Sequence, residues 1–343
     1  MKKFFALLLS LVMVIGLVAC GNDSSSTDSS TEESSGGETD KEPWKIALIL
    51  PGVISDGGWN AGAYGSLEYL ENAIGAETHY NENTTNSDAE EVIRNYATAG
   101  YDIIICHGSQ FADQVMNIAP DFTDTRFIIN SAVSYQEPNV CSLNLDYEQV
   151  GFLAGAMAAL MSESGIVASM SGPELYANIH ANVGFINGAT YVNPDIDARV
   201  CYVEDTADLA TAKELAKAYI SEGADVIRHG CDEAGLGVIE ACEESGIYAI
   251  GNVLDQTDIS PAVCTSIAQD LYSAIGALVE SWWNGEPFVA TSNLFGIADG
   301  NVGMCPYSDS VPQEVIDKMD TIVEGLKDGS IDATEGPGSA ILE

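Results

Sequence analysis

The chain has 343 residues, with 52 Asp and Glu against 12 Lys and Arg, and a formal net charge of −40 at pH 7. Such a charge repels nucleic-acid phosphates and anionic lipid headgroups, which excludes nucleic acid as a partner. The eight cysteines include no C-x-x-C pair and the four histidines no H-E-x-x-H pattern, so we expect no metal site. An acidic surface suited to a salty exterior is the simplest explanation of the charge.

Residues 1–20 have the layout of a bacterial lipoprotein signal peptide. Two lysines precede an apolar run that ends at Ala19-Cys20. A run of this length is short for a permanent membrane helix, so we predict cleavage before Cys20 and lipidation of its thiol. The lipid chains would anchor the protein at the extracytoplasmic face of the cell membrane. A plain signal peptide with an incidental cysteine is the alternative.

Residues 21–43 are predicted to form a disordered linker. The segment is mostly Ser, Thr, Gly, Asp and Glu, and it has no large apolar residue. It therefore cannot bury enough apolar surface to offset the entropy of ordering. Folding is expected to begin near Trp44, which leaves about three hundred residues. That length exceeds one compact core of ordinary size and predicts two lobes with a cleft.

From residue 44 onward, short apolar runs alternate with segments of helical periodicity. The expected strands are 45–50, 77–80, 101–106, 126–129, 165–170, 197–202, 225–228 and 248–250. The expected helices are 60–72, 88–99, 111–119, 152–161, 179–188, 208–221 and 235–245. This alternation predicts an α/β fold in which helices cover parallel sheets.

The series restarts after residue 150, which predicts two Rossmann-like lobes joined by a hinge. We expect the N-terminal lobe to comprise residues 44–150 plus about 253–290, and the C-terminal lobe residues 151–252 plus about 291–343. In open parallel sheets, ligands bind beyond the carboxyl ends of the strands. The loops that follow the strands are therefore where binding residues are expected.

The loop after the first strand reads Ser55-Asp56-Gly57-Gly58-Trp59-Asn60. Its glycines allow close approach of a ligand to the backbone, and Trp59 offers a flat apolar face. Asp56 and Asn60 offer hydrogen bonds that suit a planar heterocycle. Alternatively, Asp56 or Asn60 caps the following helix and Trp59 packs beneath it. Both interpretations can hold together.

Two acidic residues follow strands of the predicted second lobe. Asp232 comes after the strand at 225–228, and Asp255 after the strand at 248–250. Helix capping explains an isolated acid. Two acids at the ends of strands along one sheet edge, however, favour a position that faces the cleft.

Several longer motifs add to these loops. They are Asp56-Gly57-Gly58-Trp59, Phe152-Leu153-Ala154-Gly155, Tyr191-Val192-Asn193-Pro194-Asp195, Glu222-Gly223-Ala224-Asp225-Val226-Ile227 and the segment from Asn252 to Gln256. With these motifs the chain resembles the basic membrane protein family of lipoproteins, over roughly Lys45 to Pro337. Members are solute-binding components of ABC importers with a type I periplasmic-binding-protein fold.

The resemblance implies that a monomer captures a purine base or nucleoside in the cleft and delivers it to an ABC permease. Carried over by position, Trp59 would stack on the purine. Asn60 and Asp56 would lie beside the purine base, and Asp232 and Asp255 would make polar contacts from the opposite side of the ligand.

The resemblance also implies further contacts. Phe111 and Tyr176 are candidates for a second stacking face, and Asn130 is a candidate polar contact. Many nucleoside binders that the chain resembles carry Asp where Asn130 stands and Lys near Gln269. Sugar recognition is therefore open, and a free base is weighed at least equally with a nucleoside.

An enzyme is the first rival to a binding protein. No G-x-G-x-x-G follows the first strand and no G-x-x-x-x-G-K-[ST] occurs, so we expect neither catalysis nor a cofactor. A second rival is a ligand-sensing lipoprotein that signals to a membrane receptor, and a third is a binding protein for another small solute such as a sugar. The expected mechanism is hinge closure on the ligand.

Overall fold

The computed structural model describes residues 42–342. The predicted signal peptide, its lipidated Cys20 and the linker residues 21–41 lie outside the described residues. The chain from Glu42 onward forms one compact unit. Within residues 42–342, no helix is long and apolar enough to cross a lipid bilayer.

The first sheet has six strands, all parallel, in the order β11-β5-β4-β3-β1-β2. Their bounds are β1 (Lys45–Ile49), β2 (Glu77–Asn81), β3 (Ile103–His107), β4 (Arg126–Asn130), β5 (Val140–Leu145) and β11 (Ser292–Phe295). The central strand β3 reads Ile-Ile-Ile-Cys-His and is buried along its whole length. Such unbroken apolar runs are typical of parallel strands covered on both faces.

The second sheet also has six strands, in the order β12-β10-β9-β8-β6-β7. Their bounds are β6 (Ile166–Ser171), β7 (Asp197–Tyr202), β8 (Val226–Gly230), β9 (Tyr248–Val253), β10 (Val263–Gln269) and β12 (Val302–Met304). Only the pair β10 and β12 is antiparallel. Together the two sheets confirm the predicted fold class of two α/β lobes with mainly parallel sheets.

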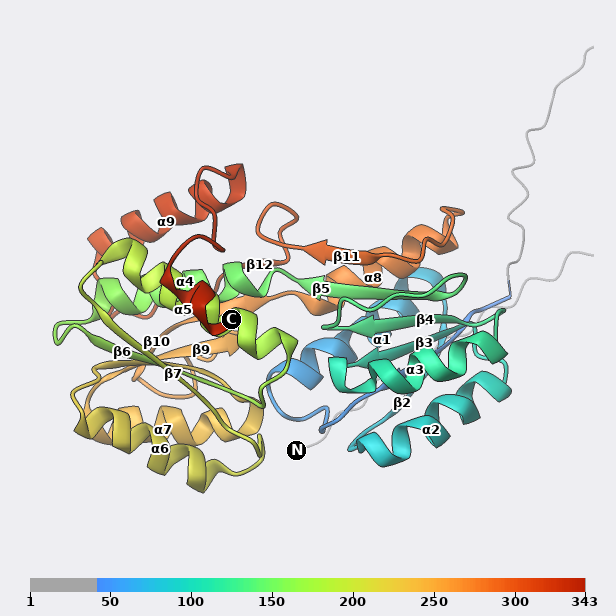
Figure 1. The fold of residues 1–343 in the computed structure, drawn as a ribbon, viewed down its shortest axis with the longest axis horizontal. Coiled ribbons are helices and arrows are strands. Elements are labelled where there is room, and N and C mark those ends of the chain that lie inside the picture. Colours follow the sequence, from blue (N-terminus) through green and yellow to red (C-terminus); the bar gives the residue numbers. More distant parts are fainter. Residues whose placement is uncertain (1–41, 343) are drawn as a thin grey trace, which may run out of the picture. The chain divides into compact units, whose positions relative to one another are not determined.

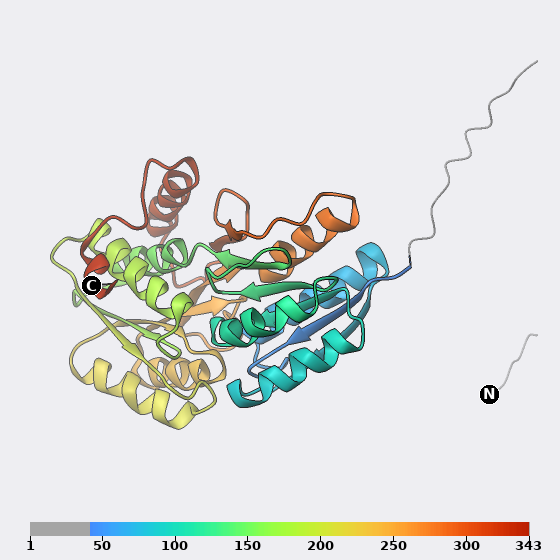
Figure 2. The same ribbon diagram turned by 45° about the vertical axis from the view of Figure 1, so that its right-hand side comes forward.

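Helices cover both sheets (Figure 1). Their bounds are α1 (Trp59–Ile74), α2 (Asn86–Thr98), α3 (Ala112–Ile118), α4 (Tyr147–Met161), α5 (Tyr176–Val192), α6 (Leu209–Ser221), α7 (Gly235–Ser245), α8 (Leu271–Trp283) and α9 (Gln313–Asp328). Side chains fix several starts: Asp146, Asp208 and Asp270 each accept a hydrogen bond from a backbone N–H in the first turn. Figure 2 shows α6 and α7 side by side along one face of the second sheet.

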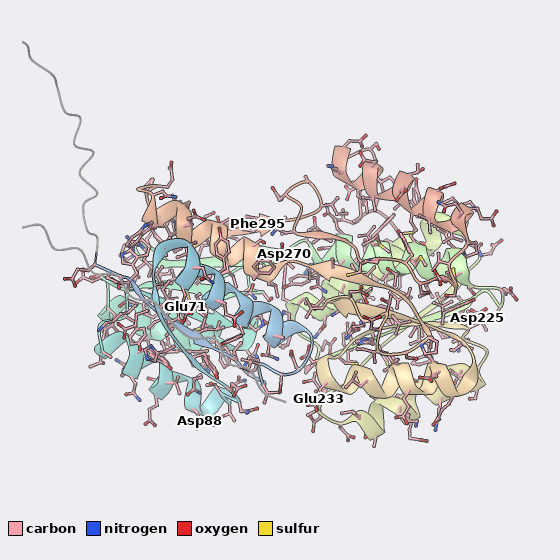
Figure 3. The ribbon with its side chains drawn as sticks, turned by 180° about the vertical axis from the view of Figure 1, so that it is seen from behind. Glu71, Asp88, Asp225, Glu233, Asp270 and Phe295 are labelled. Atoms are coloured by element: carbon pink, nitrogen blue, oxygen red, sulfur yellow. The ribbon has the colours of Figure 1, made fainter. Side chains whose placement is uncertain are left out.

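The chain passes between the two sheets three times, after β5, β10 and β11. Two of these connections contain a helix, α4 or α8, and the third is a short loop. Figure 3 labels Asp270, which follows β10, and Phe295, which ends β11. These connections are where a hinge between the sheets would have to bend.

The predicted lobe boundaries assign two strands, β10 and β11, to the wrong sheet. Strand β10 lies in 253–290 but pairs with β9 in the second sheet, and β11 lies after residue 291 but pairs with β5 in the first. The sequence of a short strand does not specify its neighbour, which depends on tertiary hydrogen bonds. Helix α8 packs against α1.

The small residues of α4 allow very close packing against α5. A Cβ on Gly155 would lie 1.9 Å from the carbonyl oxygen of Phe185, and a Cβ on Gly188 would lie 2.0 Å from that of Phe152. Only glycine permits this approach of two helix backbones. The Phe152-Leu153-Ala154-Gly155 motif is therefore a packing motif.

Candidate ligand-binding site

A cavity of about 160 Å³ opens where loops of both sheets meet. That volume is many times the roughly 10–15 Å³ that a single water needs. Its wall includes residues at or just beyond the carboxyl ends of strands, as expected for parallel sheets. They are Ser131 after β4, Gly172 after β6, Gly230 in β8, Asn252 in β9 and Gln269 in β10.

The carboxylate of Asp56 organises the start of α1. It accepts hydrogen bonds from the backbone N–H groups of Gly58 (2.9 Å), Asn60 (2.8 Å) and Ala61 (3.0 Å), and from the Asn60 side-chain amide (2.8 Å). These hydrogen bonds hold the loop together, and neither Asp56 nor Asn60 is part of the cavity wall. The capping interpretation thus describes their geometry, and the loop presents Trp59 to the cavity.

Trp59 lines the cavity with its ring against the imidazole of His107, at a centroid distance of 3.7 Å and an interplanar angle of 34°. The Asn130 amide lies 2.7 Å from Nδ1 of His107. Because an amide nitrogen can only donate, Nδ1 accepts, and Nε2 carries the hydrogen that it donates to the Trp59 carbonyl oxygen (3.2 Å). Burial lowers the pKa of His107 to about 3, so the ring is neutral at pH 7. Asn130 therefore acts on the cavity through His107 and Trp59.

Asp232 lines the cavity from the second sheet. It begins a short 3-10 turn after β8 and has a positive φ of 46°, a conformation that Asp tolerates better than most residues. Burial, with a further contribution from the charge of Asp56, raises the pKa of Asp232 to about 7, and a hydrogen bond from Thr206 opposes the shift. The carboxyl group is therefore poised between its two protonation states near neutral pH.

Arg228 is a cavity residue that the sequence reasoning missed. Its side chain is only 2% exposed. The guanidinium donates from Nη1 to the hydroxyls of Ser169 (3.2 Å) and Ser171 (2.8 Å), and from Nη2 to Oδ1 of Asn252 (3.1 Å). Burial lowers its pKa to about 10, which leaves it a cation at pH 7. In the sequence, Arg228 could have been recognised as unusual because a charged residue directly follows the apolar strand residues Val226 and Ile227.

Polar side chains continue this wall beyond Arg228. Gln269 donates from Nε2 to Oδ1 of Asn252 (2.8 Å), so this oxygen accepts from Arg228 as well. The Ser131 hydroxyl is hydrogen-bonded to the Tyr147 hydroxyl on the first-sheet side. Sequence reasoning did not single out the polar wall residues Ser109, Gln110, Ser131, Tyr147, Asn178, Thr206 and Asn252 as contacts.

Besides Asp56, Asn60 and Asn130, three further predicted contacts lie away from the cavity wall. Phe111 is fully buried in the core of the first sheet. Tyr176 is half-buried at the start of α5, where its ring packs on His180 with a centroid distance of 4.2 Å. Asp255 is exposed and accepts hydrogen bonds from the backbone N–H and hydroxyl of Thr257. Of the predicted contacts, the cavity brings together Trp59 and Asp232.

Comparison with known families gives a match over nearly the whole folded part. A family model described as "ABC transporter substrate-binding protein PnrA-like" matches residues 44–332. The chain is similar to the transcriptional activator protein Med of Bacillus subtilis, with 29% identity over 82% of this chain and 87% of that protein. A purine-binding protein of Brucella abortus is 26% identical over 87% of this chain and 85% of its own length.

The solved structures support the fold. A solute-binding protein of an ABC transporter from Aeropyrum pernix superposes with a TM-score of 0.77 at 15% identity, over 84% of this chain and 93% of that chain. A transcriptional activator of the comK gene from Bacillus halodurans superposes with a TM-score of 0.71 at 24% identity, over 84% and 99%. These likenesses place the two lobes in the periplasmic-binding-protein fold, as the resemblance implied.

Proposed function

The chain belongs to the Bmp family, the PnrA-like substrate-binding proteins of ABC transporters, and we propose that it captures a purine base or nucleoside for import. One observation carries the proposal: the flat ring of Trp59, backed by neutral His107, lies in a largely apolar cavity to which the second sheet contributes the polar side chains of Arg228, Asn252 and Gln269. A planar heterocycle with hydrogen-bonding edges matches such a cavity, because its faces are apolar and its rim is not. The name of the Brucella relative supports the same ligand class.

The proposed mechanism is closure of the two lobes around the ligand. Trp59 and Ser131 approach the ligand from the first sheet, and Arg228, Asp232 and Gln269 from the second. A ligand that contacts both groups stabilises the closed form by its differential affinity. The three connections between the sheets would bend, and the permease would recognise the closed form. Small-angle scattering with saturating ligand should show compaction, and an unchanged radius of gyration would refute closure.

The proposal extends to the N-terminal segment. Cleavage before Cys20 and lipidation of its thiol would keep the binding protein at the extracytoplasmic face, beside its permease. Mass spectrometry of protein purified from membranes tests this directly. A lipidated N-terminal Cys20 is the expected result, and an unmodified chain that still begins at Met1 would contradict it.

Thermal unfolding with a ligand panel tests the binding function. The panel comprises purine and pyrimidine bases, their nucleosides, sugars and amino acids, because a ligand that binds only the folded state raises the midpoint by mass action. A shift with purine bases or nucleosides is expected. A shift with sugars or amino acids alone would leave a binding protein of this fold and refute the purine assignment.

A second candidate is a ligand sensor that docks on a membrane receptor. The Bacillus subtilis relative is named as a transcriptional activator, and this favours a regulatory role over import. The two candidates share the cavity and differ in the partner. Cross-linking in the producing cell should recover permease subunits for the importer, whereas recovery of a signalling receptor without permease would favour the sensor.

A further inference from the structure

We propose that the cavity selects purines that carry a carbonyl at carbon 6 over 6-aminopurines, with Arg228 reading that carbonyl and Asp232 binding a ring N–H. Guanine and hypoxanthine represent the preferred class and adenine the disfavoured class. The inference rests on the proposed function, because it assigns a specificity to the same site.

Arg228 has donors that the protein leaves unfilled. A guanidinium has five N–H groups, and the protein provides three acceptor contacts, from Ser169, Ser171 and Asn252. Nη1 uses both of its hydrogens on Ser169 and Ser171, so the unfilled donors are the second hydrogen of Nη2 and the N–H of Nε, which is itself buried. Within residues 42–342, Arg228 forms no ion pair with a carboxylate. A buried cation without a counter-charge is costly, so a ligand acceptor at this position would be strongly favoured.

The surrounding backbone makes room for the guanidinium at the cavity wall. The Arg228 side chain and the position that a Cβ of residue 230 would take lie on the same side of β8, since strand side chains alternate. A Cβ on Gly230 would lie 2.5 Å from Nη2 and 2.7 Å from Cζ of Arg228. The absence of a side chain at residue 230 therefore lets the guanidinium occupy its place.

The chemistry of Arg228 distinguishes the two purine classes. A 6-oxopurine presents O6 and N7 as adjacent acceptors, which the donor fork of arginine matches. Adenine presents an amino donor beside N7, and a guanidinium can accept nothing. Asn252 is of the amide type that reads adenine, but its Oδ1 already accepts from Arg228 and Gln269.

Asp232 favours the same class. Its carboxylate lines the cavity and is an acceptor when ionised. A 6-oxopurine carries a hydrogen on ring nitrogen N1, whereas adenine has a lone pair there, which the carboxylate of Asp232 repels once it is ionised above about pH 7. Arg228 thus donates to the O6 acceptor of a 6-oxopurine, and Asp232 accepts from its N1–H donor.

The first test compares matched ligands on the purified full-length chain. Isothermal titration at pH 8 measures hypoxanthine against adenine, and guanine against 2-aminopurine, which lacks the carbonyl. The oxopurine of each pair should bind roughly 10- to 100-fold more tightly. Equal or tighter binding of adenine would overturn this inference and leave the proposed function standing. Failure of every purine and nucleoside to bind would refute the proposed function itself.

The second test uses Arg228→Lys, which keeps the charge but loses the fork. Its affinity for hypoxanthine should fall toward that for adenine, while the adenine affinity changes little. Arg199→Lys is the matched control, because Arg199 pairs with Asp197 and Glu222 at the surface. Retained discrimination in Arg228→Lys would overturn the role of Arg228. If this variant does not fold, the ligand pairs on the unaltered chain decide the question.

Discussion

Replacing Asp232 by Asn should stabilise the unliganded protein above neutral pH. Burial and the charge of Asp56 raise the pKa of Asp232 from 3.8 to about 7. Between these values the folded state binds more protons than the unfolded state, so this group makes stability fall as pH rises through the window. Above about pH 7 the full cost of the buried carboxylate is present. Asn avoids that cost because it does not ionise.

The magnitude follows from the width of the window. About three pH units at roughly 1.4 kcal/mol per unit set a ceiling of about 4 kcal/mol. Asp232 keeps some contact with solvent, so an effect of about 2 kcal/mol is more realistic. For about 300 folded residues, with an unfolding entropy of roughly 2.1 cal/mol/K per residue, that corresponds to a midpoint shift of roughly 3 °C.

Thermal unfolding of the unliganded protein at pH 5, 6, 7 and 8 measures the effect. The difference in midpoint between Asp232→Asn and the unaltered chain should grow with pH and level off above about 7. Asp255→Asn removes the same charge at an exposed turn and controls for the general repulsion within an acidic protein. A difference that is constant with pH, or that shrinks as pH rises, would refute the reasoning.

Two other substitutions test the stacking platform and the helix packing. Trp59→Ala should weaken purine binding by about 1–3 kcal/mol in isothermal titration, by analogy with bases stacked on aromatic side chains, and an unchanged affinity would assign Trp59 to packing alone. Gly155→Ala should destabilise the fold by about 1–3 kcal/mol in denaturant unfolding, because its Cβ would meet the Phe185 carbonyl oxygen at 1.9 Å. Gly303→Ala, with nothing within 4 Å of its Cβ, should change stability by less than about 0.5 kcal/mol.

The sequence predicts the parts of the fold that depend on local pattern. The apolar run at 101–106 became β3 (Ile103–His107), and the helix expected at 208–221 became α6, capped by Asp208. Strands β5 and β10 and helices α8 and α9 were not among the expected elements. Nor were strands β11 and β12, which have four and three residues and exist through pairing with partners distant in sequence. A pattern that needs several residues to appear cannot reveal them.

The sequence predicts which residues follow the ends of strands, where binding residues are expected. It does not predict which of their side chains point into the cavity. Trp59 and Asp232 follow strands of parallel sheets, and both reach the cavity. Phe111 follows β3 in the same way, yet its ring turns into the core. Asp255 caps its own turn, as its spacing from Thr257 allows. Periodicity gives the end of a strand but not which way the next loop turns.

The cavity wall contains two ionisable side chains, Arg228 and Asp232, whose charged forms are unfavourable in the unliganded protein. Burial opposes ionisation of both groups: it lowers the pKa of Arg228 to about 10 and raises that of Asp232 to about 7. Groups that weaken the folded state and lie in a cleft are characteristic of functional sites. A ligand that supplies an acceptor to one and a donor to the other removes both costs at once. Because those contacts reach the second sheet while Trp59 belongs to the first, the same ligand would draw the two lobes together.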